Sequence, residues 1–252
     1  MKFITLGTAH GDPTPIRFNT SSLLDCAQGR VLIDAGTPVL ALLIRQGIDP
    51  NSVHEVVITH MHEDHFGGLP DLMKFAAKRR APGSRPLRIH IPEAAAVEPI
   101  RNFVQAAHRP VPEEFVTFAV LTAGSRTVAD GVKVTAFPTR HFGNEKLDYP
   151  SYALALEAEG KRLVVTGDLR SDFSDFPKEA FGGGADLGCC ELTHYDLAAA
   201  LPILAQAPVK KMVFHHIGNE WHRPGGAALF RQYCQKLPYP CVMAEDGEEF
   251  TL

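Results

Sequence analysis

The stretch His60-Met61-His62-Glu63-Asp64-His65 holds three imidazoles and the carboxylate of Asp64 within six positions of the chain. The apolar run from Val56 to Thr59 precedes it and predicts a short buried strand. Gly67 and Gly68 follow it and permit a tight turn into a helix near Leu69. Residues two apart on an extended chain face the same side, so we expect His60 and His62 to reach one ion together. Asp64 and His65 come after the turn, which suits a second ion.

A histidine-rich surface loop is the simplest alternative interpretation of this stretch. In a chain of this composition, the pattern is expected by chance only about 0.0015 times, and the strand and turn around it strengthen the motif further. The stretch therefore predicts a metal site. Imidazole and carboxylate ligands suit zinc, and they also suit iron or manganese.

Composition and charge are those of an ordinary globular enzyme. The chain has 252 residues, 45% of them apolar and 21% charged, with a net charge of −4. This charge does not favour a polyanionic partner such as nucleic acid. The N-terminal stretch from Met1 to Gly7 predicts neither a signal peptide nor a membrane span. Five cysteines without CxxC spacing favour reduced thiols and a cytoplasmic location.

Strands and helices are predicted to alternate along the whole chain, which indicates an α/β or α+β fold. Expected strands are 3–6, 22–26, 31–34, 56–59, 87–91, 116–121, 132–138, 152–157, 162–166, 187–192, 212–214 and 241–244. Expected helices are 38–44, with Thr37 as N-cap, 69–78, 93–107 with an interruption at Pro99, 197–205 and 227–235.

One basic cluster stands out between the predicted helix 69–78 and the strand that follows it. It contains Lys78, Arg79, Arg80, Arg85 and Arg88. Such a cluster is most simply a solvated helix end that complements the helix dipole. The alternative is a contact surface for a phosphate-bearing substrate.

The stretch from Ile58 to His65, with Gly67, Gly68 and Leu69, resembles the signature of the metallo-β-lactamase-fold hydrolases. The resemblance implies a four-layer αββα sandwich of two mixed sheets with outer helices, formed by residues 1–252 as a single domain. It also implies a two-metal site between the sheet edges. The ions would be two divalent cations, with zinc the first expectation and manganese or iron the alternatives.

Three further ligands are expected at the ends of later predicted strands, namely His141, Asp168 and His216. By resemblance, metal one would bind His60, His62 and His141. Metal two would bind Asp64, His65 and His216, and Asp168 would bridge the two ions. His215 competes with His216, but it takes a strand-end position that the family often fills with Thr, so we expect it to have a role in the pocket instead.

Within this superfamily, the chain is most similar to the ribonuclease Z-like branch. The opening Phe3-Ile4-Thr5-Leu6-Gly7-Thr8 and the stretch 152–168 carry this likeness. Two departures concern the substrate. Cys190-Glu191-Leu192-Thr193 stands where ribonuclease Z has His-Glu-Ala-Thr, so Cys190 would replace a proton-donating histidine, and no insertion is long enough for a tRNA-gripping arm.

The resemblance therefore implies a binuclear hydrolase that attacks its substrate with a metal-bridging hydroxide. Asp64 or Asp168 would orient this nucleophile, and His194 or His215 would protonate the leaving group. We expect a small phosphodiester as substrate, with specificity set by the loops 11–19 and 143–150. Nucleic acid and membrane partners are not expected, and a homodimer is left open. The alternatives are hydrolysis of a lactone, thioester or β-lactam, tRNA 3′-processing, and a di-iron redox or metal-binding sensor protein.

Overall fold

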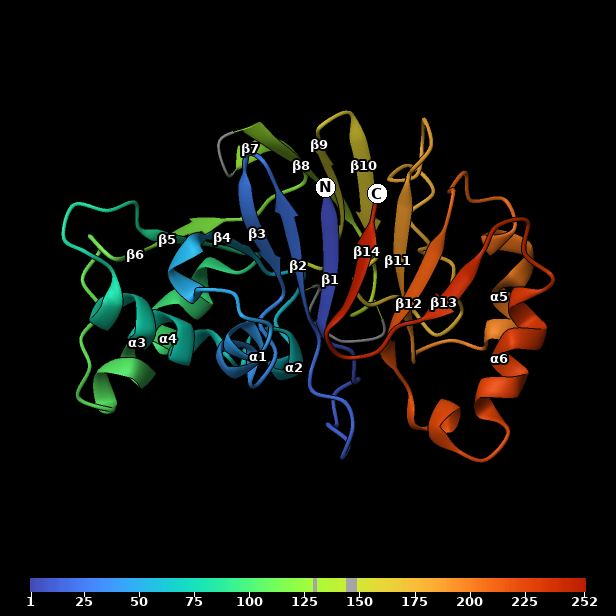
Figure 1. Ribbon diagram of the computed structural model, residues 1–252, viewed down its shortest axis with the longest axis horizontal. Coiled ribbons are helices and arrows are strands. Elements are labelled where there is room, and N and C mark those ends of the chain that lie inside the picture. The colour runs from blue at the N-terminus through green and yellow to red at the C-terminus, as the bar shows by residue number, and fades with distance from the viewer. Residues whose placement is uncertain (129–130, 144–148) are drawn as a thin grey trace.

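In the computed structural model, which describes residues 1–128, 131–143 and 149–252, two mixed β-sheets face each other and helices cover their outer sides (Figure 1). This is the αββα arrangement that the family resemblance implies, and it confirms that expectation. The two sheets are built alike, because each has antiparallel strands on one side and parallel strands on the other.

The first sheet contains the N-terminal strands and the last strand of the chain. Its order is β14-β1-β2-β3-β4-β5-β6, and the pairs β3/β4, β4/β5 and β5/β6 are parallel. The bounds are β1 Lys2–Gly7, β2 Ser21–Cys26, β3 Gly29–Ile33, β4 Val53–Val57, β5 Leu87–Ile91, β6 Val116–Val120 and β14 Glu248–Thr251.

The second sheet has the order β13-β12-β11-β10-β9-β8-β7, with β10 to β13 parallel to one another. The bounds are β7 Gly124–Val128, β8 Val132–Pro138, β9 Tyr152–Ala158, β10 Lys161–Val165, β11 Leu187–Leu192, β12 Met212–Ile217 and β13 Cys241–Met243.

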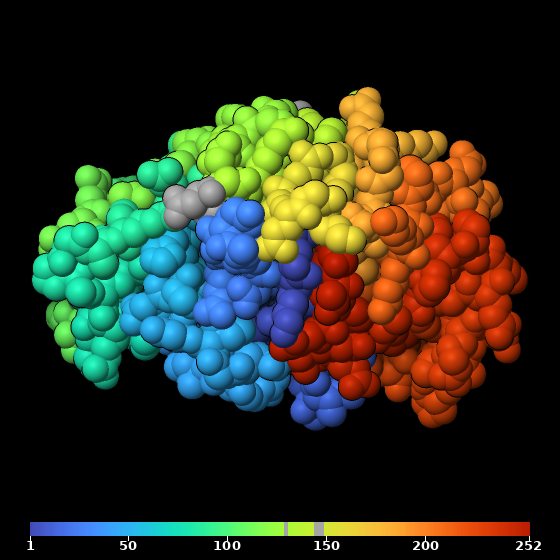
Figure 2. Space-filling view, turned by 45° about the horizontal axis from the view of Figure 1, so that its top comes forward, coloured from blue at the N-terminus to red at the C-terminus, as the bar shows by residue number. Residues whose placement is uncertain are grey.

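The helices form the two outer layers. The first sheet is covered by α1 Val39–Arg45, α3 Leu69–Arg79 and α4 Val97–Ala106, and the second by α5 Leu197–Leu204 and α6 Gly226–Cys234 (Figure 1). The short helix α2 Glu63–Phe66 lies beside α1. Residues of about 60–120 thus lie at one end of the molecule and residues of about 195–240 at the other, while β1 and β14 meet in the middle (Figure 2).

Three apolar cores hold these layers together. The central core joins the facing sides of the sheets and includes Phe3, Val57, Leu154, Val165 and Val213. The other two lie between each sheet and its helices. Neighbouring residues of a strand point to opposite faces, and each buried Val or Leu contributes about 1.5–3 kcal/mol. The cores therefore fix the register of the strands whose ends carry the polar groups described below.

The elements differ from the sequence prediction in several places; β4 spans Val53–Val57 rather than 56–59, for example, and α2 was not expected. Strands β7 and β14 were not expected; β7 pairs with the next strand, β8, whereas β14 pairs with β1 at the other end of the sequence. Thr37 is not the N-cap of α1. That position is Pro38, while the Thr37 hydroxyl lies 2.9 Å from Oδ1 of Asn19. Pro99 does not interrupt its helix, because α4 begins two residues earlier and proline is tolerated in a first helical turn.

None of the helices in the described part of the chain combines the length and the apolar character that crossing a membrane requires.

Candidate metal centre

The ends of several strands meet at one edge of the sandwich and carry the predicted site residues. Strand β4 ends at Val57, and the chain then turns through His60 and His62 into α2, whose N-cap is His62. Because α2 begins at once, Asp64 and His65 lie on its first turn. A backbone hydrogen bond fixes this turn, since the amide of His65 donates to the carbonyl of His62 over 3.0 Å.

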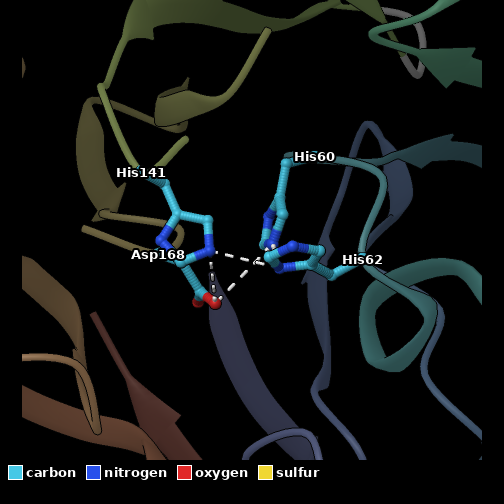
Figure 3. A group of neighbouring side chains, drawn as sticks. All are labelled: His60, His62, His141 and Asp168. Carbon is cyan, nitrogen blue, oxygen red and sulfur yellow. Dashed lines mark hydrogen bonds and ion pairs between the residues drawn. The ribbon is translucent and has the colours of Figure 1, made fainter. Parts of the chain in front are cut away.

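The first group consists of His60, His62, His141 and Asp168 (Figure 3). Nδ1 of His62 lies 3.1 Å from Nε2 of His60 and 3.1 Å from Nε2 of His141. Oδ2 of Asp168 lies 3.6 Å from the first of these Nε2 atoms and 3.9 Å from the second. The predicted ligands of metal one therefore point their nitrogen and oxygen atoms toward one common position.

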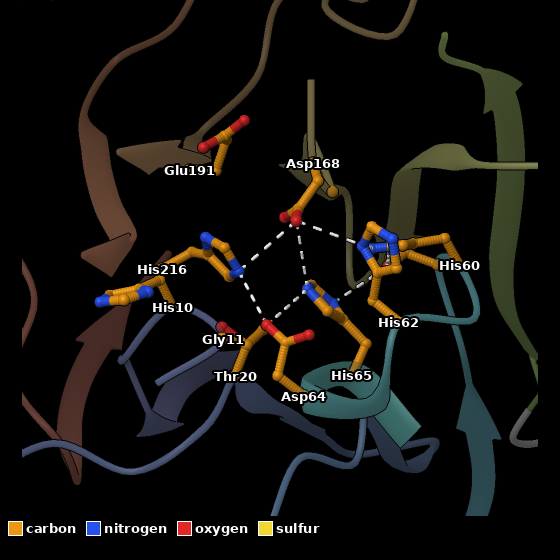
Figure 4. A network of polar contacts seen from close by, with 12 residues as sticks. His10, Gly11, Thr20, His60, His62, Asp64, His65, Asp168, Glu191 and His216 are labelled. Carbon is orange, nitrogen blue, oxygen red and sulfur yellow. Dashed lines mark hydrogen bonds and ion pairs between the residues drawn. The ribbon is translucent and has the colours of Figure 1, made fainter. Parts of the chain in front are cut away.

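The second group consists of Asp64, His65 and His216, with Asp168 beside them (Figure 4). Nε2 of His216 lies 3.1 Å from Oδ2 of Asp64 and 3.4 Å from Oδ2 of Asp168. Nε2 of His65 is 3.4 Å from each of these two carboxylate oxygens. Oδ2 of Asp168 thus adjoins both groups, as a bridging ligand must.

A β-bulge selects His216 rather than His215 for the second group. On β12, His215 pairs with Glu191 and Ile217 pairs with Leu192, so His216 is the extra residue, and its φ is 52°. A bulge of this kind re-aims a side chain. His215 is buried as well, but neither of its ring nitrogens has a hydrogen-bond partner among the described residues.

Asp34 is a functional residue that we did not predict. It follows β3 with a φ of 57°, a strained conformation that Asp tolerates better than most residues. Its Oδ2 lies 2.8 Å from Nδ1 of His65, and its Oδ1 accepts the amide of Thr59 over 2.7 Å. A carboxylate that accepts from a histidine orients the ring and leaves its other nitrogen available to a metal. The position of Asp34 just after a strand was the available signal.

The protonation states of His60 and Asp168 suit cation binding, whereas His65 has to release a proton when a cation binds. Burial and the neighbouring His65 lower the pKa of His60 well below its usual value, so this ring is neutral. Burial would raise the pKa of Asp168, but His216, His65 and His60 lower it well below its usual value. For His65, the charges of Asp168 and Asp34 outweigh burial and raise the pKa. Neutral imidazoles and ionised carboxylates are the forms that bind metals.

The nitrogen and oxygen atoms of the site fit metal ions, because several of them lack a suitable hydrogen-bond partner. Nε2 of His65 and Oδ1 of Asp168 are buried without a hydrogen-bond partner among the described residues. Three imidazole nitrogens also crowd together around His62, although imidazoles cannot all serve one another as donor and acceptor. A shared cation resolves both problems. The assignment of these seven residues as ligands remains a prediction.

The carboxylate of Glu191 fixes the His194 ring next to the predicted metal ligands. Its buried carboxylate lies 3.0 Å from Nδ1 of His194 and accepts backbone amides from Leu169, Thr193 and His194 itself. Burial would lower the pKa of His194, but the hydrogen bond to Glu191 and the charges of Asp168 and Glu191 raise it to about 9. The His194 ring lies against those of His141 and His216. Sequence reasoning gave Glu191 no such role.

The position of Cys190 contradicts the expectation that this residue replaces a proton-donating histidine of the site. The side chain of Cys190 is buried in the core between the second sheet and its helices, 3.4 Å from the hydroxyl of Tyr195. Burial raises the pKa of its thiol to about 12. Residue 190 therefore points away from the metal ligands, and the cysteine removes no proton donor from the site.

Of the two loops predicted to set specificity, 11–19 is described throughout and 143–150 only in part. His10, in the loop after β1, lies beside His216 (Figure 4), and Gly11 lies close to Asp64, since a Cβ there would be 4.0 Å from Oδ2 of Asp64. Most of the second loop, residues 144–148 of 143–150, lies outside the described residues.

Comparison with known proteins identifies the family. Residues 1–182 match the model of the family described as anti-Pycsar protein Apyc1. The chain belongs to the Apyc1 family. It is also 32% identical, over 317 aligned positions covering all of both chains, to ribonuclease BN of Shigella boydii. To ribonuclease Z of Bradyrhizobium diazoefficiens it is 27% identical over 169 residues, 66% of this chain and 53% of that protein, so the match spans about half of that relative's length.

Solved structures show the same fold. The metallo-β-lactamase-fold protein YhfI of Bacillus subtilis has a TM-score of 0.79 at 18% identity and covers 99% of this chain and 98% of its own. The short form of human tRNase Z has a TM-score of 0.75 at 21% identity, covering 100% and 99%. A diphosphatase from the PhnP family has a TM-score of 0.72 at 18% identity, covering 100% and 97%. The Apyc1-family chain is thus a ribonuclease Z-like member of the metallo-β-lactamase fold.

Proposed function

We propose that the protein is a metal-dependent phosphodiesterase that hydrolyses a small phosphodiester. The observation that carries the proposal is the pair of ligand groups that adjoin the one carboxylate of Asp168, with His194 held above them by Glu191. Metal-dependent hydrolysis is what the relatives named above support, and the choice of a phosphodiester is our own extension. As part of the same proposal, we extend to this protein the anti-Pycsar role that the family's description gives.

The metal ligands would be those predicted from the sequence. His60, His62 and His141 would hold one divalent ion and Asp64, His65 and His216 the other, with Asp168 between them. Such ions would supply Lewis acidity, polarise the phosphoryl group and make water acidic enough to act as a nucleophile at neutral pH.

Asp64 would orient the attacking water. Burial opposes ionisation of this carboxyl, but the hydrogen bond with His216 and the charge of His65 lower its pKa to about 2. Asp64 is therefore ionised at neutral pH and can accept, but not donate, a hydrogen bond. An acceptor in a fixed position lowers the entropic cost of bringing water to the phosphorus atom.

His194 would protonate the leaving oxygen. Glu191 occupies Nδ1, so Nε2 of this half-buried ring remains for the substrate. Its raised pKa keeps the ring protonated, and the charge of bound cations would lower that pKa toward neutrality, where a general acid is most effective. His215 fits this role poorly, because burial and the charge of His216 lower its pKa to about 3.

Two observations favour a small substrate over tRNA. Two members of the basic cluster have structural roles, because Arg80 donates to the carbonyls of Arg85 and Val53 and Arg85 pairs with buried Glu55, which leaves three exposed cations, Lys78, Arg79 and Arg88. The alignment with ribonuclease BN also takes 317 positions for the 252 residues here, so this chain lacks segments that the relative has. Nucleic acid is a second candidate substrate, because the relatives named above are ribonucleases.

A substrate panel tests the proposal. Zinc- and manganese-loaded protein would be assayed with bis(p-nitrophenyl) phosphate, a lactone, a thioester, a chromogenic β-lactam and precursor tRNA, the last at two salt concentrations. We expect hydrolysis of the phosphodiester, slow or absent tRNA cleavage and no activity in the His60→Ala variant. Turnover of the lactone or thioester alone would move the enzyme to carboxylic bonds. Efficient, salt-sensitive tRNA cleavage would reject the small-substrate argument.

A further inference from the structure

Cys234 and Cys241 bring two thiols together at the edge of the second sheet. Cys234 is the last residue of α6, and Cys241 is the first residue of β13, the edge strand of that sheet. Residues 235–240 turn the chain back between them, and the amide of Leu237 donates to the carbonyl of Cys234 over 3.1 Å. Both cysteine side chains therefore pack against the same apolar core, between the second sheet and its helices.

The two thiols are in direct contact. A hydrogen bond between them raises the pKa of the Cys234 thiol, and burial acts in the same direction. The same hydrogen bond lowers the pKa of the Cys241 thiol, although burial opposes this change. The sulfur of Cys241 also lies 3.6 Å from the carbonyl oxygen of Tyr239. Cys241 is therefore the sulfur that more readily becomes a thiolate, and the thiol of Cys234 lies beside it.

Exposure distinguishes this pair from the other three cysteines of the chain. Cys234 and Cys241 are free thiols and neither is fully buried, so a small oxidant has access to them. Cys189 and Cys190 are buried, and burial raises the pKa of both thiols. Cys26 is partly exposed, but it lies on β2 of the first sheet. Among the five cysteines, only Cys234 and Cys241 combine access with a neighbouring thiol.

The sheet geometry excludes a competing bond between Cys241 and Cys190. Cys190 lies on β11 and Cys241 on β13, with β12 between these two strands. Neighbouring strands are about 4.8 Å apart, so the Cα atoms of the two residues are separated by roughly 10 Å or more. A disulfide requires Cα atoms within about 7 Å of each other. Cys241 therefore has one partner thiol within reach, that of Cys234.

We propose that Cys234 and Cys241 form a redox-active pair, which hydrogen peroxide converts into a disulfide that ties the end of α6 to β13. The thiolate of Cys241 attacks one peroxide oxygen and the O–O bond breaks, and the released hydroxide takes up the proton that this thiol lost. The sulfur of Cys234 then attacks the sulfenic acid on Cys241, so that the S–S bond forms and the S–O bond breaks. The proton of Cys234 leaves with this hydroxide as a second water. Two electrons pass from the sulfurs to the peroxide.

The disulfide stabilises the outer layer and leaves the metal centre unchanged. Cys241 pairs with Met212, the first residue of β12, whereas His216 lies near the other end of that strand. The bond closes the loop 234–241 and removes conformational freedom mainly from the unfolded chain. We therefore expect oxidation to raise the Tm by about 5 °C and to leave the metal content unchanged.

Peptide mapping of the zinc-loaded protein after peroxide treatment tests the pair. Remaining thiols would be blocked with N-ethylmaleimide before digestion. Trypsin cuts after Arg231 and Lys236, so Cys234 and Cys241 fall into the separate peptides 232–236 and 237–252. We expect these two peptides to be linked in the non-reduced digest. Dithiothreitol should separate them and return the Tm of the intact protein to its starting value.

Single variants assign the roles of the two sulfurs. In Cys234→Ser, dimedone should trap a sulfenic acid on Cys241, at a level about tenfold above that on Cys234 in Cys241→Ser. Cys26→Ser is the matched control, because it removes a partly exposed thiol outside the pair and should still form the link. Circular dichroism would show that every variant is folded. Peptides that stay unlinked, Cys241 linked to another cysteine, or equal dimedone labelling of the two variants would overturn the proposal.

Discussion

Oδ2 of Asp34 lies 2.8 Å from Nδ1 of His65, and both side chains are at most 1% exposed. This contact fixes the orientation of the His65 ring and leaves Nε2 facing Asp64 and Asp168. The carboxylate that achieves this sits on a residue with a positive φ, so backbone strain is accepted at the position that supports the site.

Asp34→Asn should weaken metal binding by about 10- to 100-fold, because an amide group in place of Oδ2 no longer accepts the His65 proton. Asn tolerates the positive φ, so the fold should survive. Metal affinity would be measured by competition with a chromogenic chelator. Asp71→Asn, a change in an exposed residue on α3, is the control. Unchanged affinity in the Asp34 variant would reject this orienting role.

His216→Ala should lower the occupancy of the second metal, whereas His215→Ala should leave both ions bound. The reason is that Nε2 of His216 adjoins two carboxylates, while the ring nitrogens of His215 contact no polar group among the described residues. Metal content after dialysis, measured by plasma mass spectrometry, separates the two variants. Loss of metal in the His215 variant alone would reverse the assignment.

His194→Gln should lower kcat for a diester with a poor alkoxide leaving group by about 10²- to 10³-fold, but much less for p-nitrophenolate, which needs no proton. In the wild type, kcat for the poor leaving group should fall as pH rises through the pKa of His194, because the acid form is then lost. The variant should lack this fall. Equal losses for both leaving groups would show that His194 does not act as the acid.

The residues of the metal centre show which parts of a site can be predicted from the sequence. His60, His62, Asp64 and His65 were predicted because they are close together in sequence, and His141, Asp168 and His216 because each follows a predicted strand and matches the family's pattern. Asp34 and Glu191 act on other side chains, and only the folded structure brings them to His65 and His194. The bulge at His216 depends on pairing with β11, a contact between distant segments.

The strands, like the site residues, can be predicted from the sequence only where the local sequence determines them. Buried strands such as β3 and β10 carry runs of apolar residues that reveal them. Edge strand β14 has the sequence Glu-Glu-Phe-Thr, and it becomes a strand only because β1, at the other end of the chain, supplies its hydrogen-bond partners. Local propensity carries no information about such a partner.

Glu55→Gln should reduce the free energy of unfolding by about 3 kcal/mol at pH 7, because it breaks a buried charge network. Glu55 is 1% exposed and lies 2.7 Å from Nε2 of His90 on β5, which in turn contacts Arg126 on β7 of the other sheet. Burial opposes the charge of Glu55, but hydrogen bonds with His90 and Arg85 lower its pKa.

Since the pKa of Glu55 is lowered on folding, its stabilisation is complete above the unfolded-state pKa of about 4.5 and is lost as pH falls through the folded-state value. The difference between wild type and variant should therefore shrink in acid. Urea unfolding at pH 7 and at pH 4 or below would measure it. Glu113→Gln, at a residue whose side chain is 87% exposed, should change stability little at either pH. A constant difference at all pH values would contradict the network's role.

The shared position of Asp168 between two metals is the central claim, and anomalous X-ray diffraction from crystals of the zinc-loaded protein tests it most directly. We predict two zinc peaks, one among His60, His62 and His141 and one among Asp64, His65 and His216, each within bonding distance of Asp168. A single peak, peaks elsewhere in the molecule, or a carboxylate of Asp168 that contacts neither ion would contradict the account.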